Sequence, residues 1–128
     1  MLFQCVTEAT VVRLVDAFYG KVRADPVLGP VFARTIAPEG WPAHLAKMYA
    51  FWSSVMLTTG RYKGNPMAAH MAVEGIEGPM FERWLTLFGE AAGELFAERE
   101  AAIFRLKAQR IAESLKLGLF FRPAQQRR

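Results

Sequence analysis

The chain has 128 residues, of which 52% are hydrophobic and 22% are charged, and its formal net charge at pH 7 is +4. This length fits one domain with a single sizeable core, and the apolar content excludes an intrinsically disordered chain. No stretch approaches the roughly 20 apolar residues of a membrane span, so no membrane contact is expected. The start of the chain lacks the basic residues of a signal peptide, and the single cysteine, Cys5, fits a reducing compartment. We therefore expect a cytoplasmic protein.

Much of the positive charge lies at the C-terminal end of the chain. Without Arg122, Arg127 and Arg128, the net charge falls from +4 to +1. Elsewhere Lys and Arg are interleaved with Glu, which predicts solvated helix faces and no nucleic-acid interface. We therefore expect one domain over residues 1–121, followed by a basic, disordered tail over residues 122–128.

The N-terminal third of the chain shows helical periodicity, because apolar residues recur every three or four positions. The first predicted helix follows Thr7, a suitable N-cap, and ends before Asp25-Pro26. The segment 26–40 is interrupted by two prolines and a glycine, so the pattern predicts only short 3₁₀ turns around Leu28 and Phe32.

The rest of the chain predicts three more long helices. One begins near Pro42 and ends at Thr58 or Thr59, and another extends from Pro79 through residue 96. The connection between them is long for a compact domain, contains a short helix after Pro66, and is of a kind that is commonly functional. The last helix is predicted from about Glu98 to Phe120, with a buried stripe of Ile103, Leu106, Ile111, Leu115 and Leu119. Together these elements predict an all-α fold.

The two histidines of the chain, His44 and His70, both lie in apolar surroundings. Met48 and Phe51 follow His44 at helical spacing, so its imidazole projects onto the buried face. A core histidine bonded to a backbone carbonyl is one interpretation of His44. The other is a haem pocket, because iron takes imidazole ligands and apolar side chains hold a flat cofactor. The sequence has no phosphate loop, no cysteine pair for zinc and no H-E-x-x-H motif.

Tyr19 and Trp84 also fit two interpretations. Each shares a helical face with apolar residues, so each is explained on its own as a core residue. Alternatively, these two side chains and the two histidines converge on one cavity. There, the Tyr19 hydroxyl and the Trp84 indole N–H would donate hydrogen bonds to a ligand.

Four segments together resemble a known family. FYGKVRADPVLGPVF, WPAHLAKMYAFW, YKGNPMAAH and FERWLTLF occur in the order and at the spacings of the truncated haemoglobins of group III, also called the P group. The resemblance extends from about Thr7 to Phe120. It implies a globin-like fold, a two-over-two helical sandwich around haem b. The glycine pairs typical of groups I and II are absent, which agrees with group III.

The resemblance also implies roles for individual residues. His70, after YKGNP, corresponds to the proximal ligand of the haem iron. His44, Tyr19 and Trp84 correspond to the distal residues that contact a bound ligand. His44 is expected to act as a gate, with coordination of the iron as the alternative.

The remaining correspondences concern the haem itself. Phe32 matches the phenylalanine that packs on the haem. The other apolar pocket positions correspond to Phe18, Met48, Phe51 and Trp52. The candidates for contact with a haem propionate are Lys47, Arg61 and Tyr62.

The resemblance implies tight binding of O2 and of other diatomic ligands such as NO and CO, since donors in a dry pocket hold such ligands strongly. Slow release favours redox chemistry on O2, NO or peroxide, as in an NO dioxygenase or a peroxidase, over O2 storage. A reductase is then the expected partner, and a monomer or weak dimer the expected state. A gas-sensing or ligand-binding module without turnover is the alternative. A third possibility is a small helical regulator that binds no haem and uses its basic tail.

Overall fold

The computed structural model describes residues 1–71, 73 and 75–120, so the predicted tail over residues 122–128 lies outside the described residues. Over this range, the elements in chain order are α1 (Glu8–Ala24), α2 (Leu28–Thr35), η1 (Pro38–Gly40), α3 (Trp41–Leu57), α4 (Pro66–Met71), α5 (Gly78–Leu95) and α6 (Glu98–Phe120). The prediction of an all-α fold is confirmed. None of the described helices is long and apolar enough to cross a membrane.

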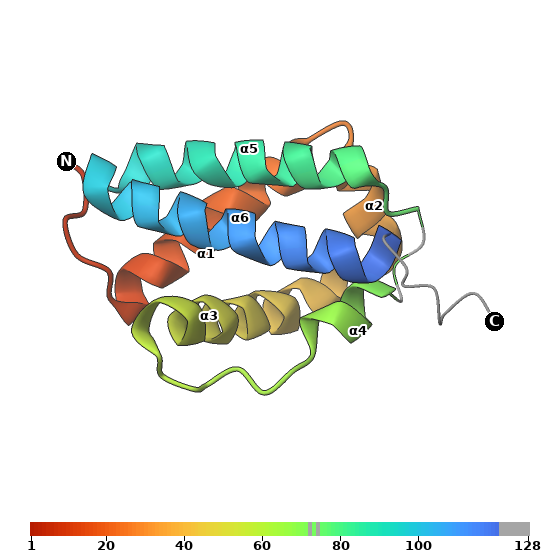
Figure 1. The fold of residues 1–128 in the computed structure, drawn as a ribbon, viewed down its shortest axis with the longest axis horizontal. Helices are drawn as coiled ribbons and strands as arrows, with labels where there is room; N and C mark the ends of the chain where they lie inside the picture. The colour runs from red at the N-terminus through yellow and green to blue at the C-terminus, as the bar shows by residue number, and fades with distance from the viewer. Residues whose placement is uncertain (72, 74, 121–128) are drawn as a thin grey trace.

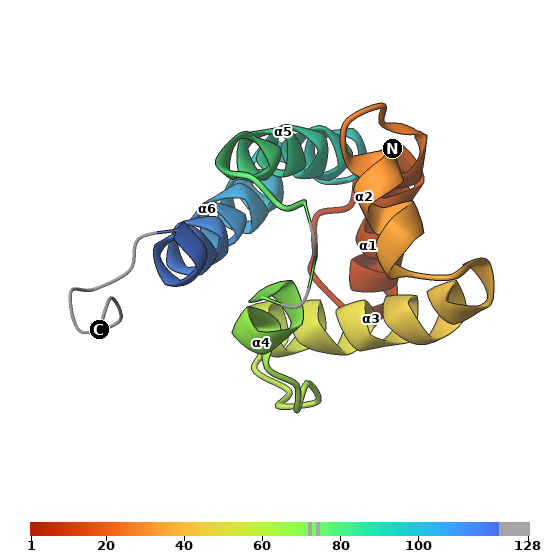
Figure 2. The same cartoon turned by 90° about the vertical axis from the view of Figure 1, so that its right-hand side faces the viewer.

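The four long helices are arranged as two pairs. Figures 1 and 2 show α5 beside α6 in one pair and α1 beside α3 in the other. α1 also packs against α5, and this contact joins the two pairs. The short helix α4 packs against α6, while α2 connects the end of α1 to the start of α3. This arrangement is the two-over-two sandwich that the resemblance implies.

α1 begins and packs as its sequence predicts. The Thr7 hydroxyl accepts a hydrogen bond from the backbone N–H of Thr10 at 3.1 Å, and the Thr10 hydroxyl accepts from the N–H of Thr7 at 2.8 Å. This reciprocal pair caps the helix by satisfying two otherwise unpaired N–H groups. Buried residues recur along one face of α1 at helical spacing: Val11, Leu14, Val15, Phe18, Tyr19 and Val22.

The prediction of 3₁₀ turns for residues 26–40 is wrong in its first half, where α2 is an α-helix of eight residues. Pro30 occupies the third position of α2, where a backbone N–H would have no partner within the helix. Proline therefore removes no hydrogen bond of the helix. Gly29 permits a close approach to α1, because a Cβ there would lie 2.9 Å from the carbonyl oxygen of Arg23. Only the second half contains a 3₁₀ turn, η1.

The predicted buried stripe of α6 is partly wrong. Ile103 and Leu106 are 40% and 46% exposed, whereas Leu115 is buried as predicted. Smaller residues, together with one phenylalanine, form the face toward the core: Ala101, Phe104, Ala108 and Ala112. Methyl side chains let α6 lie close to α5, while Ile103 and Leu106 lie on the outer face.

An ion pair joins the end of α1 to α5. The Arg83 Nε and Nη2 atoms lie 2.7 and 2.5 Å from Asp25 Oδ1, and the Asp25 carboxylate is buried. Asp25 Oδ2 accepts from the backbone N–H groups of Val27 and Leu28 at 3.0 and 2.9 Å, at the start of α2. The hydrogen bond from Arg83 is the largest cause that lowers the pKa of Asp25. One carboxylate therefore fixes the junction of three helices.

Asp25→Asn should lower the free energy of unfolding at pH 7 by about 1–3 kcal/mol, because the amide loses the charge-assisted bonds to Arg83. Since the pKa of Asp25 is lowered from 3.8, its contribution is fully present above about pH 5 and is lost as the pH falls through the lowered value. Urea unfolding from pH 7 downward measures this. The wild-type advantage should shrink at acid pH, and an advantage that stays constant would contradict the assignment. Glu39→Gln, at an exposed position on η1, is the control.

Candidate functional site

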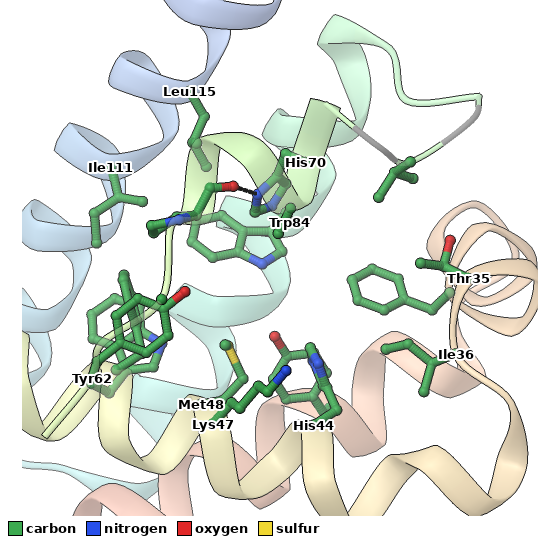
Figure 3. A pocket seen from close by; sticks show the side chains of 18 of the residues that line it. Thr35, Ile36, His44, Lys47, Met48, Tyr62, His70, Trp84, Ile111 and Leu115 are labelled. Carbon is green, nitrogen blue, oxygen red and sulfur yellow. Dashed lines mark hydrogen bonds between the residues drawn. The ribbon is translucent and has the colours of Figure 1, made fainter.

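A cavity of about 580 Å³ lies among the helices, and side chains from all six α-helices and from residues 61–65 line it. Its volume is in the range of pockets that hold cofactors and drug-sized ligands. In Figure 3, His70 lies on one side of the hollow, His44, Lys47 and Met48 lie on the other, and Trp84 lies between them in this view. The lining is mainly aliphatic and aromatic, with a few polar side chains that converge on the hollow.

The structure brings together nearly all the side chains that the sequence singles out. The predicted site residues in the lining are Tyr19, Phe32, His44, Lys47, Met48, Phe51, Trp52, Arg61, Tyr62, His70 and Trp84. Phe18 does not line the cavity; it is 1% exposed. Its ring packs 4.8 Å from the Tyr19 ring and 5.7 Å from the Trp84 ring, so its packing helps to hold both rings in place.

His70 is oriented by its own short helix. Asn65 Oδ1 accepts from the backbone N–H of Ala68 at 3.1 Å and so caps α4, which begins at Pro66. His70 Nδ1 lies 2.7 Å from the Pro66 carbonyl oxygen, the bond that Figure 3 marks. A carbonyl only accepts, so Nδ1 carries the hydrogen, and Nε2 of the neutral ring keeps its lone pair. This tautomer is the one that binds a metal through Nε2.

α4 is held against α6 by a close contact at Gly118. A Cβ at position 118 would lie 2.5 Å from the thioether sulfur of Met67, so only glycine leaves room for Met67 in its present position. The His70 ring lies 6.4 Å from the ring of Phe81 on α5. The position of His70 therefore depends on how α4 is seated against α5 and α6.

His44 projects from α3 into an aromatic corner. Its ring lies 5.1 Å from Tyr19 and 5.4 Å from Trp41, nearly perpendicular to both. Burial lowers the pKa of His44, and the positive charge of Lys47 lowers it further, so the neutral ring is favoured. His44 Nε2 is buried and has no hydrogen-bond partner among the described residues. Buried polar atoms are usually paired, so a core role does not account for this nitrogen.

Tyr19 and Trp84 are held rigidly by neighbouring rings. Tyr19 is 7% exposed, and its ring packs against Phe32 at 5.9 Å and Trp41 at 5.7 Å. Trp84 stacks on Phe88 at 5.7 Å with an interplanar angle of 12°. Burial raises the pKa of Tyr19 well above its ordinary value, so the phenol keeps its proton and remains a donor. In Figure 3, the indole nitrogen of Trp84 is directed toward the hollow.

The three predicted propionate contacts differ in their surroundings. The Arg61 guanidinium is paired with Glu8 of α1. The Tyr62 backbone N–H donates to Ser54 Oγ at 2.9 Å, and its ring lies 5.2 Å from the ring of Phe51. Lys47 lines the cavity and has no acidic partner in the part of the chain that the structure describes. Its ammonium group is therefore the most readily available cation of the candidates.

Sequence reasoning missed several aliphatic lining residues. Val31 and Ile36 come from α2 and its end, where only turns are predicted. Ile111 and Leu115 lie on α6, where the periodicity predicts burial but does not indicate that they face a cavity. The spacing of apolar residues identifies a buried face and leaves open whether a protein side chain or a ligand covers it.

The donor set fits a haem. A flat apolar cofactor needs an apolar hollow, an imidazole with a free Nε2, and a cation for its carboxylates; the cavity, His70 and Lys47 supply these. The unpartnered Nε2 of His44 lies across the hollow from His70 in Figure 3. The described residues contain no cluster of three His, Cys, Asp or Glu side chains for a bare metal ion.

Comparisons with known proteins agree with this geometry. Residues 2–113 match the family model described as bacterial-like globin. The chain is 33% identical to the group 3 truncated hemoglobin ctb of Campylobacter jejuni subsp. jejuni, over 94% of this chain and 96% of that protein. The crystal structure of a group III truncated hemoglobin from Campylobacter jejuni is similar with a TM-score of 0.89, at 33% identity, and the match covers 94% of this chain and 96% of that one.

Proposed function

Because the chain belongs to the bacterial-like globin family as a group III truncated haemoglobin, a family membership that implies haem and diatomic ligands, we propose that it holds haem b through His70. We propose further that it holds O2 tightly for redox chemistry on O2, NO or peroxide. The observation that carries the proposal is the hydrogen bond from His70 Nδ1 to the Pro66 carbonyl at 2.7 Å. It leaves the Nε2 lone pair for iron and fixes the orientation of the ring.

The cavity walls would position the cofactor. Phe32, Met48 and Phe51 supply apolar contacts to a flat ring, and Lys47 supplies a cation for a carboxylate at its edge. Arg61 contributes only if it leaves Glu8, its partner in this structure. When bound, haem would supply the iron that binds the diatomic ligand.

The distal side chains would hold that ligand. The Tyr19 hydroxyl and the Trp84 indole N–H both donate, and each neutral hydrogen bond contributes about 1 kcal/mol. The mainly apolar lining reduces the competition of water for these donors. His44 is neutral and packs edge-on against Tyr19, and in that position it serves as a gate beside the ligand.

Slow release of O2 makes storage a poor use of such a pocket and favours reaction of the held ligand. Each turnover then requires electrons from a reductase, and we propose such a partner in the cytoplasm. A gas-sensing module without turnover would share this pocket, and only the fate of the ligand distinguishes the two.

His70→Gly should abolish stable haem binding, because no other described side chain on the same side of the cavity as His70 offers an imidazole. The Soret band of the purified variant should be lost, and added imidazole should restore it by filling the space of the missing ring. His44→Leu is the matched control and should retain haem. A His70→Gly protein that binds haem as tightly as wild type would refute the assignment.

Tyr19→Phe should raise the O2 dissociation rate about five- to tenfold, since losing about 1 kcal/mol of ligand stabilisation changes an equilibrium constant by roughly that factor. Trp84→Phe should have a similar effect. Stopped-flow displacement of O2 by CO measures the rate. Tyr49→Phe, which removes a hydroxyl that donates to Asp16 outside the cavity lining, should leave the rate unchanged. Wild-type rates in both distal variants would show that neither donor holds the ligand.

The redox part of the proposal predicts conversion of NO and O2 to nitrate when a reductase supplies electrons. Nitrate formation should exceed that of free haem under the same conditions, and Tyr19→Phe should lower it because the variant releases O2 sooner. Turnover no faster than that of free haem would instead support the sensing module.

A further inference from the structure

The outer face of α6 carries a regular row of six exposed residues. They are separated alternately by three and four positions and are Ile103, Leu106, Arg110, Glu113, Leu117 and Phe120. The opposite face of the helix, which includes Phe104 and Leu115, is buried against the core. The row therefore follows one side of α6 from residue 103 to the end of the helix at residue 120, as a coiled-coil seam does.

The apolar members of this row are strongly exposed. Ile103, Leu106, Leu117 and Phe120 are 40%, 46%, 60% and 44% exposed. The other large hydrophobic residues that are exposed in the described chain are Met1, Leu2 and Val27, so most of this exposed apolar surface lies on one helix face. Single exposed apolar residues are ordinary, whereas an aligned row of them is typical of an interaction surface. Figure 2 shows α6 at the periphery of the molecule, away from α1, α2 and α3.

We propose that this row is a self-association surface, on which α6 packs antiparallel against α6 of a second copy around a two-fold axis. The order of residue types supports a second copy of this chain as the partner. Along the chain the row reads apolar, apolar, basic, acidic, apolar, apolar. Placed against its own reverse, Arg110 faces the partner's Glu113, and Glu113 faces the partner's Arg110. The row is therefore complementary to itself.

The apolar positions match in the same register. Ile103 faces the partner's Phe120, and Leu106 faces the partner's Leu117, so two apolar pairs lie on each side of the charged centre. A parallel pairing would place each charged residue opposite its own copy, with Arg110 against Arg110 and Glu113 against Glu113. Like charges opposed in this way are unfavourable, so the charges select the antiparallel arrangement.

The residues beside the row permit this pairing. In an antiparallel pair, Lys107 lies beside the partner's Ser114, and Gln109 lies beside the partner's Lys116. Neither contact places like charges opposite one another. Lys116 already pairs with Glu82 at 3.0 Å within its own chain, which reduces its free charge further.

The size of the surface sets the strength of the dimer. Residues 103–120 span about 26 Å of helix, so one helix from each copy makes the contact. Interfaces of this extent lie below the size of about 1,600 Å² that is usual for stable complexes. The dimer should therefore form reversibly and depend on protein concentration.

Charge reversal tests the register. Arg110→Glu and Glu113→Arg each place like charges opposite one another, so each variant alone should dimerise at least about tenfold more weakly than wild type. An equal mixture of the two should recover association, because every charged contact in the mixed dimer joins opposite charges. Sedimentation velocity of the haem-loaded full chain over a wide concentration range measures both effects.

Glu39→Arg is the matched control, because it makes the same charge change at an exposed site on η1 and should associate like wild type. Circular dichroism and the Soret band confirm that each variant is folded. A wild-type protein that is monomeric throughout overturns the proposal. So do single variants that dimerise as well as wild type, or a mixture that gains nothing over its components.

Discussion

The close packing of α5 on α6 is the constraint on which the rest of the molecule depends. Ala101, Ala108 and Ala112 of α6 are completely buried. On α5, a Cβ at Gly89 would lie 3.3 Å from the Arg105 side chain, which instead extends over the α5 backbone and donates to the Gly89 carbonyl at 2.9 Å. Small residues on both helices thus bring two backbones together. The helix pair becomes a rigid wall against which α1 and α4 are placed.

The candidate site depends on this wall because α4 has only six residues and cannot hold its own position. Met67 seats α4 at Gly118, near the end of α6, and the Pro66 carbonyl then fixes the ring of His70. α6 also lends Ile111 and Leu115 to the cavity. One helix therefore seats the helix that carries the metal-binding candidate, and it also supplies part of the cavity lining.

Local signals predicted much of the fold, and larger-scale packing decided the rest. Thr7 is identifiable as a cap because capping involves residues three positions apart. α2 was mispredicted because the position of Pro30 within the helix decides whether proline breaks it. Ile103 and Leu106 were misplaced because periodicity ranks large apolar residues as core, whereas the face of α6 toward the core is formed mainly by alanines and by Phe104. The packing of α5 on α6 is a tertiary property that no short window of sequence contains.

The site was more predictable than the packing, because its polar residues are conspicuous in apolar surroundings. The same feature makes the cavity costly to the folded chain. Without a ligand, a buried His44 Nε2 that lacks a partner would cost about 1–3 kcal/mol, and an unfilled apolar hollow would forfeit contacts that a filled core makes. A ligand that fills the hollow and binds the native state alone removes both costs, and so stabilises the fold by mass action. In this chain, affinity for a cofactor and stability of the fold are therefore two aspects of the same cavity.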